Sequence, residues 1–222
     1  MLKRKRQSNT QLVVAGRQVD IADQIQDFLE LRQLYNAAMR KVKTKVEILG
    51  EEFQVRYNHN PIHHIECRLK TPQSIIEKLN RKGYELSLES IRKNIMDIAG
   101  IRVICNYIDD IYTIADLLLK QDDVALVRKR DYIANPKENG YRSLHLVVVT
   151  PVFLSDRKEH VPVEVQIRTI AMDCWASLEH NLIYKSSRPL PDNIKEQLKE
   201  CADAVNAIDM KIRDIYRQLW QL

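Results

Sequence analysis

The chain has 222 residues, of which 45% are hydrophobic and 29% are charged. These are values of a folded globular protein, so extensive disorder is excluded, and the length suits one domain, alone or with helical extensions. The net charge is +5, and four of those charges come from Lys3, Arg4, Lys5 and Arg6. The rest of the chain is nearly neutral, so a basic patch over the whole fold is not expected.

Cysteine usage and the first residues indicate a cytoplasmic protein. The four cysteines form no CxxC pair and lie mostly in apolar patterns, where a free cysteine behaves as a small hydrophobic residue. A reducing compartment is therefore expected. Residues 7–11 are polar at the position where a signal peptide needs an apolar run, so the sequence predicts neither a secretion signal nor a membrane span.

Long helices are predicted at both ends of the chain. Residues 1–18 are expected to form a flexible basic arm, a candidate contact for RNA. From Ile21, apolar residues spaced 4-3-4-3 predict a long helix over 19–56. The same spacing from Ile194 to Leu222 predicts a second long helix over 189–222. Such seams more often pack within one chain, but sustained heptads also make the second helix a candidate oligomerisation element.

The middle of the chain, 57–188, is predicted to be one core of helices and strands. Helices are expected from Thr71 to Leu79, ended by Gly83, from Ser87, over 109–120 and over 170–184. Strands are expected over 101–106, 124–133, 142–150 and 161–169, with a loop over 135–140. Without a tight βαβα alternation, the expected fold class is α/β (α+β), with a mixed, largely antiparallel sheet flanked by helices.

The strand over 161–169 alternates strictly between apolar and polar residues. One face is apolar, with Val161, Val163, Val165 and Ile167. The other face carries a carboxylate, an amide and a guanidinium, from Glu164, Gln166 and Arg168. Alternation alone is equally typical of a half-solvated antiparallel strand. The polar row becomes a candidate site because two further segments precede it, Asp97–Val103 and Asn139–His145.

A cationic stripe opens at the N-terminus of the helix that follows Thr71. Arg68 and Lys70 precede the helix, and Ser74, Lys78 and Arg81 follow at helical spacing. The unpaired backbone N–H groups and the helix dipole favour an anion at this end. A solvated helix face would explain the same pattern without a ligand.

Read together, in their order along the chain, these four motifs resemble the synthetase domain of the RelA/SpoT-type enzymes over about Asn60 to Lys185. They resemble most closely the stand-alone small alarmone synthetases of the RelP and RelQ kind. The resemblance implies a nucleotidyltransferase-like fold and a GTP pyrophosphokinase, which transfers the β,γ-pyrophosphate of ATP to the 3′-hydroxyl of GDP or GTP. It also implies a homo-oligomer, with a tetramer as the expected state. Nothing resembles the hydrolase motif of the long family members, so synthesis without hydrolysis is expected.

The resemblance also implies roles for individual residues. Binding of ATP would involve Arg68, Lys70, Ser74, Lys78 and Arg102, with the two arginines on either side of adenine. Binding of GDP or GTP would involve Tyr141 on the guanine, Lys137, Arg130 and His145 on phosphates, together with Gln166 and Glu179. Mg²⁺ would be held by Asp97 and Glu164, and Glu164 would also accept the proton of the attacking hydroxyl.

Two other functions remain open at this point. One is a nucleotidyltransferase that acts on protein or RNA, and the other is a non-catalytic nucleotide- or RNA-binding module. Asp97 alone could be a turn or cap residue, and the loop over 135–141 could be a plain hairpin connection. The sequence does not rank GDP against GTP.

A cluster of metal-ligand residues precedes the cationic stripe. His59, His63, His64 and Cys67 lie within nine residues, a spacing compatible with an inhibitory zinc site. The pattern matches no standard zinc signature, and Pro61 interrupts it. A capped turn that leads into the core is the alternative.

Overall fold

The computed structural model describes residues 11–14, 17–185 and 191–220. Its central element is a five-stranded sheet in the order β3-β4-β7-β6-β5, in which only β4 and β7 are parallel. The strands are β3 (Ile62–Leu69), β4 (Ala99–Cys105), β5 (Ala125–Asp131), β6 (Leu144–Phe153) and β7 (Lys158–Thr169). The predicted mixed, largely antiparallel sheet is therefore confirmed.

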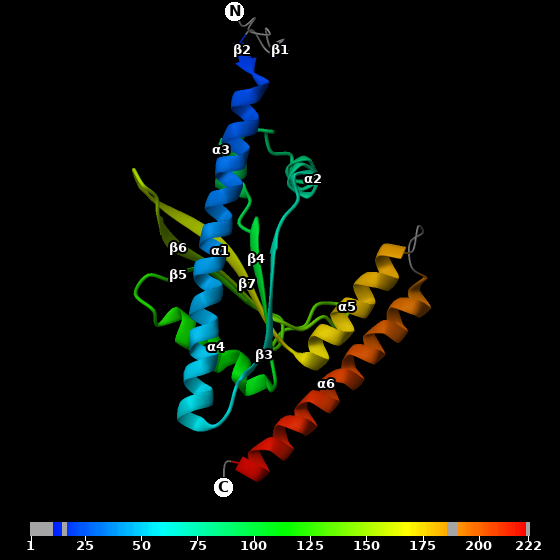
Figure 1. The fold of residues 1–222 in the computed structure, drawn as a ribbon. Coiled ribbons are helices and arrows are strands. Elements are labelled where there is room, and N and C mark those ends of the chain that lie inside the picture. Colours follow the sequence, from blue (N-terminus) through cyan, green and yellow to red (C-terminus); the bar gives the residue numbers. More distant parts are fainter. Residues whose placement is uncertain (1–10, 15–16, 186–190, 221–222) are drawn as a thin grey trace, which may run out of the picture.

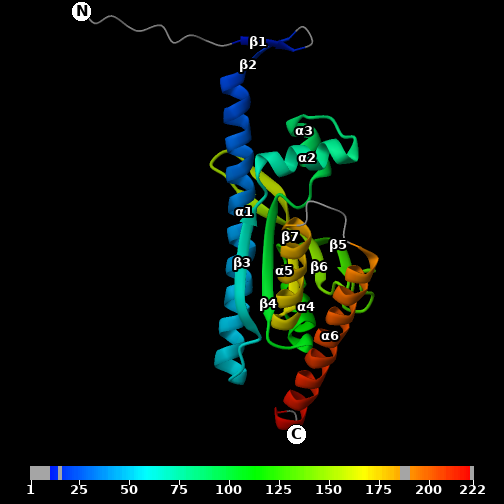
Figure 2. The same cartoon turned by 90° about the vertical axis from the view of Figure 1, so that its right-hand side faces the viewer.

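Six helices are described around this sheet (Figure 1). They are α1 (Ile21–Tyr57), α2 (Pro72–Lys82), α3 (Leu88–Asn94), α4 (Ile108–Leu119), α5 (Ile170–Lys185) and α6 (Asp192–Trp220). The long helix α1 runs along one side of the sheet, while α5 and α6 lie side by side away from α1 (Figures 1 and 2). No helix within the described ranges is long and apolar enough to cross a bilayer; a cytoplasmic location stays a prediction.

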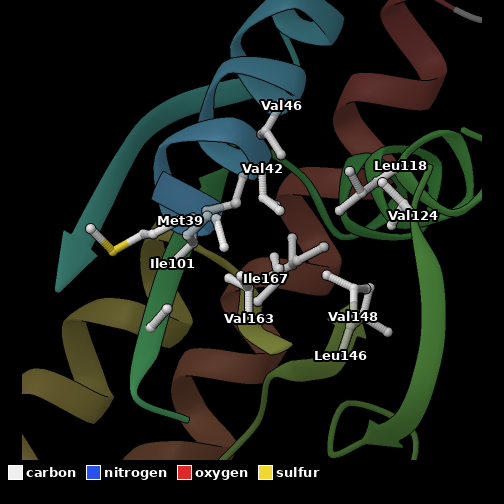
Figure 3. Close-up of a cluster of buried hydrophobic side chains, with 14 of the residues drawn as sticks. Met39, Val42, Val46, Ile101, Leu118, Val124, Leu146, Val148, Val163 and Ile167 are labelled. Atoms are coloured by element: carbon white, nitrogen blue, oxygen red, sulfur yellow. The ribbon is translucent and has the colours of Figure 1, made fainter. Parts of the chain in front are cut away.

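The hydrophobic core lies between the sheet, α1 and α4. Figure 3 shows Val42 and Val46 of α1 facing Val163 and Ile167 of β7, with Leu118 of α4 beside them. All five side chains are at most 2% exposed in these packed positions. The apolar face predicted for the strand over 161–169 is therefore the core face, and burial of these branched side chains supplies the main driving force for folding.

The helix boundaries follow from local capping. Thr71 accepts a hydrogen bond from the backbone N–H of Ser74 at the start of α2, and Gly83 ends that helix with φ of 69°. Ser87 caps α3 in the same way through Ser90. A side-chain acceptor at the first turn and a left-handed glycine after the last turn satisfy the otherwise unpaired backbone groups.

Two segments differ from the sequence-based expectation. Residues 62–69, for which no strand was expected, form β3, an edge strand whose side chains are mostly exposed. An edge strand with both faces partly in solvent carries no apolar alternation, so periodicity could not find it. In addition, β1 (Gln11–Val14) and β2 (Arg17–Asp20) form an antiparallel pair within the segment expected to be a flexible arm, whereas Lys3–Arg6 lie outside the described residues.

Candidate active site

The face of the sheet opposite the core carries a polar row that crosses all five strands. In register, Glu66 of β3 pairs with Arg102 of β4, which pairs with Gln166 of β7. Gln166 pairs with His145 of β6, which pairs with Arg130 of β5. Because paired residues point to the same face of a sheet, side chains from distant parts of the sequence share one surface. The polar face predicted for β7 is the middle of this row.

A pocket opens on this face between β3, β4 and β7. Gly100 of β4 lies between Arg68 of β3 and Glu164 of β7 in the strand register. The glycine leaves the space that a side chain would fill between these two residues. The pocket is lined by Glu66, Cys67, Arg68, Asp97, Gly100, Ile101, Arg102, Glu164 and Gln166. It therefore brings together both predicted carboxylates and both predicted adenine-binding arginines.

Asp97 precedes β4 and is held by two lysines. Lys70 Nζ and Lys78 Nζ each donate to Asp97 Oδ2 at 2.7 Å. Burial disfavours the charged carboxylate, but these two hydrogen bonds outweigh burial and lower the pKa of Asp97. Its other oxygen, Oδ1, is buried and has no hydrogen-bond partner among the described residues. The carboxylate thus stays ionised and keeps one oxygen for a further ligand.

The first turn of α2 places the phosphate-binding candidates next to Asp97. Ser74 is half-buried at the capped N-terminus of α2, and Lys78 lies one turn further on, so that it reaches the carboxylate. Lys70 reaches it from the connection before the helix. Two members of the predicted stripe, Lys70 and Lys78, thus meet at one anion, and Arg68 lines the same pocket as Asp97. Arg81 is exposed and lies outside this arrangement.

The two predicted adenine-binding arginines differ in how firmly their side chains are held. Arg102 Nη1 donates to Glu66 Oε2 at 2.8 Å and lies 3.5 Å from Asp173 Oδ1. Arg68 is exposed on the edge strand. One planar cation fixed in the floor and one free to move at the rim suit binding of a flat base between them.

Glu164 lies on β7 at the bottom of the pocket. Its side chain is 18% exposed, and Gln166 Nε2 donates to its Oε2 at 2.9 Å. The imidazole Nδ1 of His145 is 3.9 Å from Glu164 Oε1. The carboxylate is therefore oriented by its neighbours while still open to the pocket, as a proton acceptor or metal ligand requires.

Tyr141 and Arg168 lie together at the centre of the predicted acceptor side. Arg168 is only 3% exposed and donates to Tyr141 Oη at 2.9 Å and to Gln166 Oε1 at 2.7 Å. It also pairs with Asp173 at 3.2 Å. Arginine can only donate, so the phenol hydrogen of Tyr141 is directed to His145 Nε2, 2.8 Å away. Sequence reasoning placed Arg168 in the polar row of the strand without giving it a role, and it missed Asp173, whose position in the first turn of α5 was the available signal.

The remaining acceptor-side candidates surround Tyr141. Lys137 Nζ lies 4.5 Å from the Tyr141 ring centre and 4.8 Å from the ring of Tyr132, an aromatic residue that sequence reasoning missed. Arg130 is exposed and donates to Tyr132 Oη at 3.3 Å. Glu179 of α5 accepts a hydrogen bond of 2.9 Å from Asn139 in the loop before Tyr141. Glu179 therefore contacts the loop that carries Tyr141.

The structure does not bring together the four residues of the candidate zinc site. His59 is hydrogen-bonded to Asp110 at 2.9 Å and stacks near Tyr107, away from the pocket. His63 contacts His64, and Cys67 lines the candidate pocket instead. Within the described part of the chain, no group of three or more His, Cys, Asp or Glu side chains is placed to hold a metal ion. The four residues are separated for two reasons. Side chains on β3 alternate in direction, and His59 lies before this strand begins.

Burial and the surrounding cations keep His145 neutral. Desolvation, followed by Arg168 and Lys137, lowers the pKa of His145 to about 3 from 6.5. Between pH 6.5 and about 3 the unfolded chain therefore binds a proton that the folded protein does not. This difference lowers folding stability by up to about 1.4 kcal/mol per pH unit as the pH falls, and its effect is absent above pH 6.5.

We therefore expect His145→Gln to flatten the acid limb of the stability curve. Glutamine can still accept from Tyr141 but does not titrate. The free energy of unfolding, measured by urea denaturation between pH 6.5 and 4, checks this, with exposed His160→Gln as the matched control. A parental slope in His145→Gln would show that this histidine is not the titrating group.

Comparisons with known proteins agree with this arrangement. A family model described as "Region found in RelA / SpoT proteins" matches residues 67–189. GTP pyrophosphokinase YwaC of Bacillus subtilis is 41% identical over 200 residues, which are 90% of this chain and 95% of that protein. GTP pyrophosphokinase YjbM of the same organism is 38% identical, covering 82% and 84% of the two chains.

Solved structures show the same fold. Small alarmone synthetase 1 from Bacillus subtilis, bound to its product pppGpp, aligns with a TM-score of 0.79 at 36% identity, covering 86% of this chain and 97% of that chain. Small alarmone synthetase 2 from Bacillus subtilis aligns with a TM-score of 0.79 at 42% identity, covering 86% and 99%. The mixed sheet with a pocket on its polar face thus defines a nucleotide-handling synthetase fold. Within that class, the chain belongs to the RelA/SpoT family.

Proposed function

We propose that the protein is a GTP pyrophosphokinase that makes ppGpp or pppGpp and AMP from ATP and GDP or GTP, without hydrolase activity. The observation that carries the proposal is the pocket in which Glu164 and Asp97 meet the arginines of the adenine side, with Tyr141 and Lys137 in the loop before β6 and Arg168 on β7 beside it. Membership of the family and the names of its relatives support the same reaction.

On the donor side, Arg68 and Arg102 hold the adenine of ATP, while Lys70, Ser74 and Lys78 bind its phosphates. The two lysines that now pair with Asp97 are the groups that triphosphate oxygens would attract. Their release from Asp97 would free its Oδ2 for a cation that enters with the nucleotide and takes the place of the lysines as the neutralising charge.

Asp97 and Glu164 would hold Mg²⁺. The buried, unpartnered Oδ1 of Asp97 and the accessible carboxylate of Glu164 fit a hard cation, whose shell one or two carboxylates and substrate phosphates complete. When bound, the ion would neutralise charge on the phosphates. The scarcity of further carboxylates in the pocket suits a metal carried mainly by the nucleotide.

On the acceptor side, Tyr141 stacks on guanine, and Lys137, Arg130 and His145 face the phosphates, with Gln166 and Glu179 fixing the neighbouring groups. Glu164 accepts the proton of the ribose 3′-hydroxyl, whose oxygen bonds to the β-phosphorus of ATP. The bond from that phosphorus to the bridging oxygen breaks, and AMP leaves. The protein's contribution is positioning and charge neutralisation.

Incubation with ATP, GDP and Mg²⁺, followed by separation of the products, tests this function. AMP together with a guanosine tetraphosphate is the expected result. Release of pyrophosphate with a labelled protein or RNA acceptor would instead indicate a nucleotidyltransferase, and binding without turnover would indicate a non-catalytic module.

We also propose that the protein is a homo-oligomer, a tetramer by analogy with the family resemblance. The C-terminal half of the heptad seam of α6 does not pack within the chain: Ile208 is 56% and Leu219 66% exposed, and Ile212 and Ile215 are exposed beside them. The side of α6 that faces the core carries instead Ala202, Val205, Asp209 and Tyr216. A continuous apolar stripe left outside the fold suits contact with another copy. RNA contact through Lys3–Arg6 remains a separate prediction.

Ile208→Asp is expected to reduce the oligomer to a folded monomer, because it places a charge in an apolar contact without unpacking the core. Light scattering at micromolar concentration, together with thermal unfolding, measures both properties. Ala207→Asp is the control, since Ala207 is exposed one position along the same helix and points about 100° away. A parent chain of 26 kDa in solution would contradict self-association.

A further inference from the structure

The helix α6 lies beyond the segment that the family model matches, yet it contacts the loop that carries the acceptor residues. The matched segment ends at residue 189, and α6 begins at Asp192. In both views α6 runs beside α5 (Figures 1 and 2). Its residues 199–203 touch the end of the loop that runs from 135 to 141.

The closest approach is between Gly140 and Ala202. Gly140 has φ of 84°, a conformation that favours glycine, and an added Cβ would lie 2.5 Å from Ala202 Cβ and 3.7 Å from Lys199 Cγ. The loop can therefore reach the helix only because one partner has no side chain and the other has a methyl group. Any larger side chain at position 202 would push the loop outward.

Arg142 fastens this contact with three hydrogen bonds. Its Nη1 donates to Gly140 O at 3.1 Å and to Ala202 O at 3.3 Å, and its Nη2 donates to Asp203 Oδ1 at 3.0 Å. The Arg142 side chain is 14% exposed, whereas that of Asp203 is 57% exposed. The mostly buried bonds to the two backbone carbonyls therefore matter more than the ion pair with Asp203.

Tyr141 is backed by the same helix pair. Trp175 and Ala176 of α5 and Ala202 of α6 form a small buried cluster, against which Tyr141 and Val205 pack. Trp175 Nε1 donates to Leu198 O of α6 at 3.0 Å, which holds the two helices together. The place of the Tyr141 ring thus depends on α6 from behind, while Arg168 and His145 hold its hydroxyl group from the front.

We infer that α6 is a positioning element for the guanine nucleotide, through Ala202 and the Arg142 clamp, although neither residue touches the substrate. The inference rests on the proposed function, which assigns Tyr141 to the acceptor nucleotide. Among the described residues, the donor side rests on other elements: Arg68 lies on β3 and Lys78 on α2, and Lys70 between them pairs with Asp97. Disturbance of α6 at position 202 therefore acts on one substrate only.

Ala202→Leu tests this inference, with Ala204→Leu, at an exposed position of the same helix, as the matched control. We expect the KM for GDP to rise about 10- to 100-fold in Ala202→Leu. The KM for ATP should stay within about twofold of the parent, and Ala204→Leu should resemble the parent in both. Calorimetric titration with GDP should show the same selective weakening. A merely structural role would weaken both nucleotides together.

Arg142→Met is the second variant, because it keeps a long side chain but removes all three hydrogen bonds of the clamp. It should show the same selective rise in the KM for GDP even if Ala202→Leu fails to fold. Equal effects on GDP and ATP, or an unchanged KM for GDP in a folded variant, would overturn the role of α6. A parent protein that makes no guanosine tetraphosphate would overturn the proposed function instead.

Discussion

Glu164→Gln is expected to abolish most synthesis of the guanosine tetraphosphate. Loss of a general base alone costs about 10²- to 10⁴-fold in turnover, and loss of a metal ligand adds to this. Glutamine keeps the size of the side chain and can still accept the hydrogen bond from Gln166 Nε2. The strand β7 should therefore fold normally, so the loss reports on chemistry.

The measurement is kcat for AMP release, together with the thermal unfolding temperature. Glu159→Gln is the matched control, because Glu159 lies on the same strand and pairs with Arg157 outside the pocket. We expect the control to keep parental kcat. Near-parental synthesis by Glu164→Gln would show that the carboxylate assignment and the mechanism built on it are wrong.

Asp97→Asn is expected to cause a loss of similar size through the metal. Asparagine removes the negative charge that Lys70 and Lys78 neutralise in the structure and that the cation would neutralise in their place. The lowered pKa of Asp97 means that its ionised form stabilises the fold above the ordinary carboxyl pKa, and that this contribution disappears as the pH falls through the lowered value. The variant should therefore be less stable than the parent at neutral pH and converge with it in acid.

Titration of Mn²⁺ as a paramagnetic probe, with a non-hydrolysable ATP analogue present, separates metal binding from turnover. Asp97→Asn should bind the ion more weakly, whereas exposed Asp116→Asn should bind it like the parent. Tyr141→Ala provides the opposite pattern, with weak GDP binding and normal metal and ATP binding. Parental Mn²⁺ affinity in Asp97→Asn would remove Asp97 from the metal site.

The amino-acid sequence was sufficient for the elements with strong periodicity or capping. The apolar alternation over 161–169 predicted the core face of β7, and the Thr71 cap with Gly83 predicted the limits of α2. The order of the motifs around Asp97, Tyr141 and Glu164 identified the family and the reaction. These signals are local, because side-chain direction in a strand and capping of a helix depend on neighbours within a few residues.

Other features required contacts between distant residues. The edge strand β3 has no local signal, since most of its side chains face solvent on both sides. Three of the four residues of the candidate zinc cluster lie on this strand, and their side chains are not placed to hold one metal ion together. The burial of Arg168 between Tyr141 and Asp173 depends on where β7 meets α5. A polar residue in an alternating strand is read as exposed unless the partner that buries it is known.

The direction of α6 shows this division most clearly. Its heptad spacing predicted a long helix and an apolar seam, both of which the structure contains. Spacing could not decide which side of that helix meets the core, because the side that packs is set by small and polar residues, Ala202 and Asp209 among them, that match groups on β7 and the Gly140 loop. The sequence by itself determined the periodic and capped elements, the family and the chemistry of the side chains. The tertiary structure alone decided which face of each element those side chains share, since that depends on contacts between residues far apart in the sequence. Strand register joins Gly100 to Glu164, and helix packing joins Asp109 to Arg217.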